Sequence, residues 1–242
     1  MDFIVFVKCC VSLLGEYEIN VYDKYVMKQL KRIRHLLSGR VIYVCMGPEK
    51  VKDTLRKCFA FGADEVILIS DKRLIGADTY ETSYILSCIA RQYNCDYIVC
   101  GQKSTDGETG QIPFQIAARE GSYCINNVKQ LNIVNGEIFA EIELMNKKIE
   151  LKVERGSILV FNDFCVEAPV TLQMLKLEKK GNVSIKNLDD LFDRELILES
   201  KTKVLETKRR IIRNSVENIV IYDSDEGRDK ILQQIEIARG RI

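Results

Sequence analysis

The sequence predicts an α/β fold in which helices cover both faces of a doubly wound, mainly parallel β-sheet. Short, wholly apolar runs recur along the first half of the chain, amphipathic segments separate them, and the connections are short. Strands buried on both faces contain consecutive apolar residues, whereas half-exposed strands alternate apolar and polar ones. Right-handed crossovers between parallel strands then place helices on both faces of the sheet.

Strands and helices are expected to alternate from the start of the chain. The apolar runs predict strands at residues 3–8, 41–46, 65–70 and 97–101. A period close to 3.6 predicts helices at residues 20–38, 49–62, 78–92 and 109–121. Ligands of such sheets bind beyond the carboxyl ends of the strands, where the strand order reverses. The candidate walls of a site are therefore the loops after Lys8, Met46, Ser70 and Gly101.

The pattern changes after about residue 123. Residues 128–144 and 147–162 alternate like antiparallel strands, and Asn135-Gly136 is typical of a tight hairpin turn. We therefore expect a nucleotide-binding α/β domain with a hairpin extension at residues 1–168. Residues 169–242 are expected to form a partner-docking tail that ends in a helix at 226–240, with partial disorder as the alternative.

Composition excludes several classes of function. A net charge of +1 provides no field that would attract nucleic acid. With only one histidine, His35, a histidine-rich metal site or a histidine-based catalytic group is not expected. Nine cysteines without a C-x-x-C pair, the lack of a secretory segment and the lack of a membrane-spanning run favour reduced thiols in a cytoplasmic protein.

The loop STDGETGQIP at residues 104–113 is the clearest candidate for binding. Asp106-Gly107 favours a tight turn, and Thr109 or Glu108 is expected to cap the helix that follows. The unpaired amides of a first helical turn, together with the helix dipole, bind anions, and glycines let a phosphate approach the backbone. A glycine-rich turn at a helix start is also often only a connection.

Two other segments are expected at the same edge of the sheet. One is Asn20-Val21-Tyr22-Asp23, and the other is Met46-Gly47-Pro48. Each has a purely structural interpretation as well, because Asn20 is a good helix N-cap and Gly47-Pro48 is ordinary turn chemistry.

In this arrangement the chain resembles the beta subunit of electron transfer flavoproteins, from residue 1 to about residue 160. The strings that carry the resemblance are INVYD at 19–23, GPEKVKDTLRKCFAFGADEVILI at 47–69, GAD at 76–78 and YIVCGQKSTDGETGQ at 97–111. The most specific of them are G-P-E-K-x-x-x-T-L-R-K-x-x-x-x-G-A-D and the D-G-E-T-G-Q loop.

The resemblance implies a Rossmann-like, adenine-nucleotide-binding domain of the HUP type. It also implies a heterodimer with an alpha subunit that carries FAD, and electron relay between a dehydrogenase and an acceptor without a catalytic acid or base. AMP or a second FAD would occupy the beta-subunit pocket. The implied contacts are Phe6 through its backbone, Asn20, Val21, Tyr22, Asp23, Met46, Asp106, Gly107, Glu108, Thr109, Gly110, Gln111 and Ile112.

The chain departs from the family pattern in two places. Only eleven residues separate Lys8 from Asn20, and a shortened hairpin there is expected to remove one wall of the pocket. The partner-recognition segment survives only as CVEAPVTLQMLKLEKK at residues 165–180, with Leu172 as the nearest apolar anchor and a possible lysine docking patch. This segment favours a redox partner other than the usual acyl-CoA dehydrogenases.

Three other readings remain open. One is a nucleotide-binding regulatory module of the universal-stress type, although its G-x-x-G-x(9)-G-[ST] motif is absent. Another is an ATP-cleaving enzyme of the pyrophosphatase-loop group, although Val7-Lys8-Cys9-Cys10 does not supply its S-G-G-x-D-S motif. The third is a beta-like protein that has lost its redox function.

Overall fold

The computed structural model describes residues 1–12, 14–145, 147–165 and 170–192. All of them belong to the first of two units into which the chain divides, Met1–Lys203. The helix expected at 226–240 lies outside the described residues. No helix in the described part of the chain is long and apolar enough to cross a membrane.

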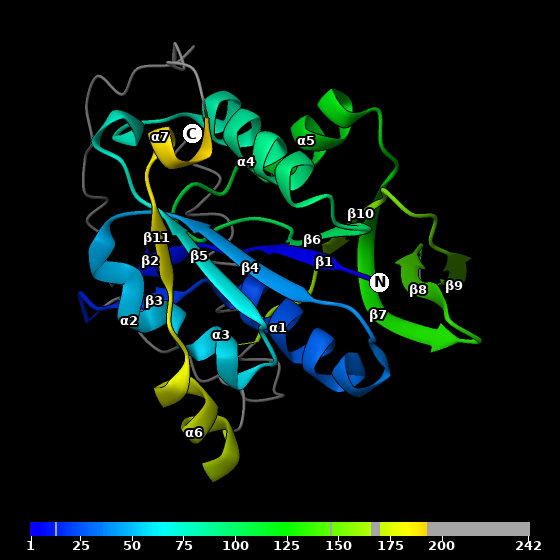
Figure 1. Ribbon diagram of the computed structural model, residues 1–242. Coiled ribbons are helices and arrows are strands. Elements are labelled where there is room, and N and C mark those ends of the chain that lie inside the picture. Colours follow the sequence, from blue (N-terminus) through cyan, green and yellow to red (C-terminus); the bar gives the residue numbers. More distant parts are fainter. Residues whose placement is uncertain (13, 146, 166–169, 193–242) are drawn as a thin grey trace, which may run out of the picture. The chain divides into compact units, whose positions relative to one another are not determined.

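Nine strands of the described residues form one sheet, in the order β11-β5-β4-β1-β6-β10-β7-β8-β9 (Figure 1). Their bounds are β1 Phe3–Phe6, β4 Val41–Met46, β5 Glu65–Ile69, β6 Tyr97–Gly101, β7 Cys124–Val134, β8 Glu137–Leu144, β9 Lys147–Lys152, β10 Ile158–Phe161 and β11 Ser184–Lys186. All neighbouring strands from β11 to β7 pair in parallel, and β8 and β9 pair antiparallel. The predicted α/β class with a mainly parallel sheet is confirmed.

Helices cover both faces of this sheet, as Figure 1 shows. One face carries α1 Val21–Ile33, α2 Lys52–Leu55, α3 Lys57–Ala60 and α6 Leu172–Lys180. The other face carries α4 Thr79–Tyr93, α5 Ile112–Glu120 and α7 Leu188–Leu191. Successive residues of β1 alternate between the two cores: Phe3 and Val5 pack on the α1 side, whereas Ile4 and Phe6 pack on the α4 side. Burial on both faces explains the unbroken apolar runs.

The extension after residue 123 agrees with expectation only in part. β7 and β8 form the predicted hairpin, and Asn135 and Gly136 both have positive φ, as a tight primed turn requires. The antiparallel assignment of residues 147–162 is wrong at its end, because β10 lies between β6 and β7 and is parallel to both. All four residues of β10, ILVF, are buried, and such a run is typical of a central parallel strand.

Three further elements differ from the expected ones. The helix expected at 49–62 is a 3₁₀ turn, Glu49–Val51, followed by the short helices α2 and α3. Residues 184–191, placed in the tail on sequence grounds, lie on the domain, where β11 pairs with β5 and α7 packs into the α4-side core. The short connection after Lys8 forms an antiparallel hairpin of its own, β2 Cys9–Val11 and β3 Tyr17–Ile19.

Candidate nucleotide-binding site

The expected site lies where the strand order reverses. From β1 the chain passes to β4 and β5 on one side, and then returns to β6 on the other side of β1. The three parallel strands β4, β1 and β6 end at the same edge, with Met46, Phe6 and Gly101 as their last residues. The predicted walls therefore meet in space, at the place where ligands of open α/β sheets bind.

Asn20 occupies the N-cap position of α1, although its side chain does not cap the helix. Its backbone amide donates to the carbonyl oxygen of Lys8 at 2.8 Å, and its Nδ2 donates to the carbonyl oxygen of Lys103 at 2.8 Å. The residue is only 3% exposed, and its Oδ1 has no partner among the described residues. A buried acceptor of this kind is costly unless something donates to it. Asn20 therefore has the features of a ligand-binding residue.

Asp23 lies one helical turn further on and is buried. Its Oδ2 accepts the backbone amide of Lys8 at 2.8 Å. A Cβ on Gly101 would lie 2.5 Å from Asp23 Oδ1 and 2.7 Å from Tyr22 Cβ, so only glycine fits there. Burial raises the pKa of Asp23 to about 7, against hydrogen bonds from the amides of Lys8 and Gly101 that lower it. The carboxylate thus ties α1 to the ends of β1 and β6.

The first half of the 104–113 loop closes on itself. The amide of Gly107 donates to Asp106 Oδ1 at 2.7 Å, and the amide of Glu108 donates to the carbonyl oxygen of Ser104 at 3.0 Å. Lys8 Nζ pairs with Asp106 Oδ1 at 2.8 Å, which links the loop to the end of β1. Burial alone would raise the pKa of Asp106, but hydrogen bonds from Lys8 and Ser104 lower it below its ordinary value.

The second half of the loop leaves its backbone donors open. The amides of residues 109–112 donate no hydrogen bond to any described residue. The prediction that Thr109 or Glu108 caps the helix is wrong, because α5 begins at Ile112 with Gln111 at its N-cap position. The positive φ of Glu108 and Gly110 prevents the helix from starting earlier. Four open amides at a helix N-terminus suit a phosphate group.

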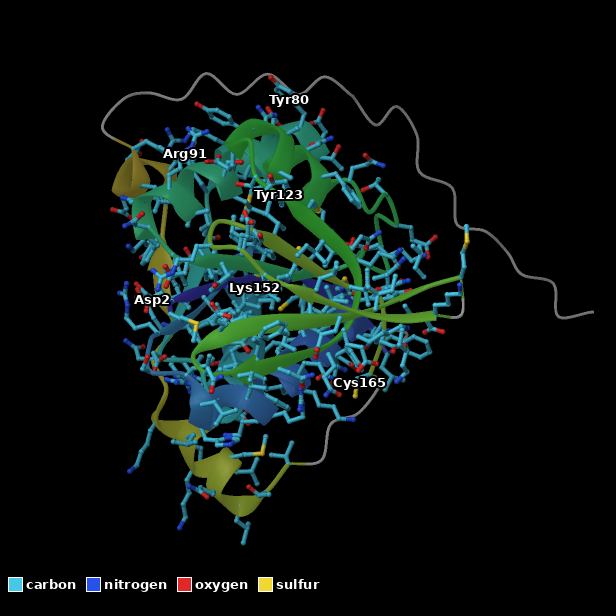
Figure 2. All side chains as sticks on the ribbon, turned by 90° about the vertical axis from the view of Figure 1, so that its right-hand side faces the viewer. Asp2, Tyr80, Arg91, Tyr123, Lys152 and Cys165 are labelled. Carbon is cyan, nitrogen blue, oxygen red and sulfur yellow. The ribbon has the colours of Figure 1, made fainter. Side chains whose placement is uncertain are left out.

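The remaining predicted residues surround this loop at different depths. The ring of Phe6 is buried in the α4-side core, so only its backbone can face a ligand. Met46 is partly exposed at the end of β4. Tyr22 packs edge-on against Phe164, with ring centroids 6.3 Å apart. The carbonyl oxygen of Val21 accepts the amide of Cys165, which Figure 2 shows on the α1 side of the sheet, away from Tyr80 and Arg91 of α4.

A hollow of about 190 Å³ lies beside Asn20 and was not foreseen from the sequence. Its lining residues are Cys10, Val11, Ser12, Glu18, Ile19, Asn20, Val21 and Thr105. Most of them belong to the β2–β3 hairpin, so the shortened connection lines this hollow. We call this hollow the hairpin pocket. The sequence signal was weak, since each strand of the hairpin is only three residues long.

The comparisons with known proteins agree with the resemblance. The model of the electron transfer flavoprotein domain matches residues 11–158. The protein FixA of Azotobacter vinelandii is 32% identical over 181 residues, which cover 72% of this chain and 59% of that protein. The electron transfer flavoprotein subunit beta of Thermoanaerobacterium thermosaccharolyticum is 32% identical over 178 residues, 73% of this chain and 64% of that one.

A shorter match covers a subunit of a larger complex. The caffeyl-CoA reductase-Etf complex subunit CarD of Acetobacterium woodii is 38% identical over 94 residues, which cover 38% of this chain and 36% of that subunit. The chain thus spans about three fifths of the length of the first two relatives.

Proposed function

This chain belongs to the electron transfer flavoprotein family, and we propose that it acts as the beta-type subunit of a heterodimer. It would hold an adenine nucleotide, AMP or FAD, in the site described above. With an alpha-type subunit that carries FAD, it would relay electrons between a dehydrogenase and an acceptor. The observation that carries the proposal is the row of open amides at residues 109–112 beside the buried, unpartnered Oδ1 of Asn20.

Different residues of the site would bind the phosphate and the nucleoside. The amides of residues 109–112 and the N-terminus of α5 would bind the phosphate, which needs no lysine or arginine. A Cβ on Gly110 would lie 3.3 Å from the carbonyl oxygen of Gln102, so the loop packs closely at the point where the phosphate approaches. Asn20, Val21 and Met46 would border the nucleoside.

The chain would contribute position and electrostatics to electron transfer. A bound flavin accepts and donates the electrons, so the protein needs no catalytic acid or base of its own. Asp23, the buried carboxylate at this edge, accepts the amide of Lys8. In this proposal it fixes the ends of β1 and β6 and transfers no proton.

Helix α6 offers a surface for the redox partner. Leu172 is 80% exposed, and Leu175 is exposed one turn later, whereas Met174 is buried against the domain. Lys176 and Lys179 flank this apolar row and are exposed. Exposed leucines within a basic rim fit a partner that presents an apolar pocket with acidic residues around it.

Co-expression with an alpha-type subunit tests the proposal. We expect a yellow complex that releases flavin on denaturation, and mass spectrometry of the released nucleotides separates AMP from FAD. Gly110→Asp should remove the nucleotide from the beta-type site, because a carboxylate would replace the phosphate beside the open amides. Thr109→Arg should act in the same way through bulk.

Gly156→Asp is the matched control. Gly156 has a positive φ like Gly110, a Cβ there would meet open space, and the residue lies before β10 at the opposite edge of the sheet. Full nucleotide occupancy in both loop variants would contradict the site. Nucleotide binding without any association with an alpha-type subunit would instead favour a regulatory nucleotide-binding module.

A further inference from the structure

Two cysteines from different strands meet near the carboxyl ends of β1 and β4. The amide of Val7 donates to the carbonyl oxygen of Val44 at 3.0 Å, so the pairing of these strands continues past the end of β1. Residues two apart on an extended chain share a face. Val7 and Cys45 both belong to the α1-side core, and Cys9, two residues after Val7, packs against the same core. Cys9 and Cys45 thus lie on the same side of neighbouring segments.

The thiols of Cys9 and Cys45 are in contact. A hydrogen bond with the thiol of Cys9, together with burial, raises the pKa of the Cys45 thiol well above its ordinary value. Cys10, the next residue of β2, points the other way and hydrogen-bonds with Thr105. Cys58 of α3 also lies near Cys45, but it is fully buried. Cys9 is therefore the thiol beside Cys45 that solvent can reach.

The difference in exposure sets the order in which the two thiols react with hydrogen peroxide. Cys9 is partly exposed, whereas Cys45 is only 1% exposed. The peroxide transfers one oxygen to the sulfur of Cys9, which becomes a sulfenic acid, and leaves as water. The sulfur of Cys45 then attacks that of Cys9: an S–S bond forms, the S–O bond breaks, and the proton of Cys45 leaves with the hydroxide as a second water. Two thiols are oxidised to a disulfide while one peroxide is reduced to two waters.

We propose that Cys9 and Cys45 form a reversible disulfide in the presence of hydrogen peroxide, and that this bond links the β2–β3 hairpin covalently to the end of β4. β2 and β3 form a two-stranded sheet of their own, so no strand pairing joins the hairpin to β4 in the reduced protein. The bond supplies that connection. Lys8, beside Cys9, pairs with Asp106 of the 104–113 loop, so oxidation also restrains the chain on which this loop rests.

Peptide mapping of the full-length protein tests the proposal. The reduced protein is treated with hydrogen peroxide, digested without reductant and analysed by mass spectrometry. The peptides that contain Cys9 and Cys45 should be joined, and dithiothreitol should separate them again. In Cys45→Ala the bridge cannot form, so Cys9 should remain a sulfenic acid that dimedone traps. Hydrogen exchange of the amides of β2 and β3 should be at least about 3-fold slower in the oxidised than in the reduced wild type, and unchanged by peroxide in Cys45→Ala.

Cys95→Ser is the matched control. Cys95 is partly exposed like Cys9, but it lies just before β6, at the opposite edge of the sheet. This variant should form the bridge as the wild type does, whereas Cys9→Ser should form none. A wild type whose Cys9 stops at the sulfenic acid, or whose Cys45 is joined to Cys58 instead, would overturn the proposal. A Cys9–Cys45 bridge that leaves hydrogen exchange in β2 and β3 unchanged would overturn the restraint of the hairpin.

Discussion

The carboxylate of Asp23 lies where α1 meets the ends of β1 and β6, and burial governs its protonation. The amide of Lys8 donates to it, and Gly101 approaches it too closely for any side chain. Its pKa is about 7 in the folded protein, against 3.8 for an ordinary aspartate. The folded state therefore binds a proton more tightly than the unfolded chain does, so this residue makes the protein less stable as the pH rises from about 4 to about 7.

Asp23→Asn should remove this pH dependence, since an amide does not titrate. The full effect of a three-unit shift is about 4 kcal/mol, and the two units that fall between pH 5 and pH 8 amount to about 3 kcal/mol, which urea unfolding at these two pH values should resolve. The wild type should lose stability between these pH values relative to the variant. Asp53→Asn, at a carboxylate that is 89% exposed, should keep the wild-type slope. An unchanged slope in Asp23→Asn would show that Asp23 is already ionised at pH 5.

At the scale of elements, the sequence predicted the strands and helices whose own hydrophobic pattern identifies them. Buried parallel strands such as β4 and β5 are continuous apolar runs, and α4 has both its apolar period and an N-cap, Asp78, whose side chain accepts the amide of Glu81. β10 was misassigned because its four apolar residues follow an alternating segment. Periodicity is not informative over so short a run, and the pairing partners of β10 are distant in sequence.

The candidate site was predictable in its parts but not in its contacts. The loop, Asn20 and Met46 were placed at one edge because parallel strands share their carboxyl ends. The start of α5 was not predictable, because it depends on the left-handed backbone of Glu108, a residue that rarely adopts it. The hollow beside Asn20 was not predictable either, since it forms between residues of the β2–β3 hairpin, whose strands are only three residues long.

The edge formed by β11 and α7 depends on one carboxylate. Asp71 accepts the amide of Leu188 at 3.1 Å and also pairs with Arg73, which reaches Asp189. Hydrogen bonds from Arg73 hold the pKa of Asp71 well below its usual range. This contribution to stability is complete above the ordinary pKa of an aspartate, and it is lost as the pH falls from there through the lowered pKa of the folded state.

Asp71→Ala should therefore loosen β11 and α7 without unfolding the rest of the domain. Hydrogen exchange of the amides of residues 184–191 should become at least about 10-fold faster, whereas exchange in β1 and β4 should stay as in the wild type. Asp189→Ala removes only the exposed partner of Arg73, so it should change exchange much less. Equal acceleration in both variants would mean that the surface ion pair, and not Asp71, holds this edge.

At the scale of the whole domain, the proposed nucleotide site and the proposed docking helix occupy different places. The site lies at the edge where β4, β1 and β6 end. The carboxyl end of α6 leads into the start of β11, and the starts of parallel strands lie at the opposite edge. Changes on α6 should therefore affect partner docking while leaving nucleotide binding intact.

This separation yields the last prediction, made for the complex with an alpha-type subunit and its electron donor. Leu172→Ala removes the most exposed apolar side chain of α6. It should slow electron transfer from the donor about 10-fold when the concentration of the complex limits the rate, an effect of about 1.4 kcal/mol. Flavin and nucleotide content should stay unchanged. Leu144→Ala, at a half-exposed leucine on β8, controls for the loss of any exposed leucine and should have no effect. Because Lys176 and Lys179 would steer an acidic donor, added salt should slow the wild-type reaction as well. If Leu172→Ala and Leu144→Ala transfer electrons at the same rate, the donor docks elsewhere and α6 is only a structural helix.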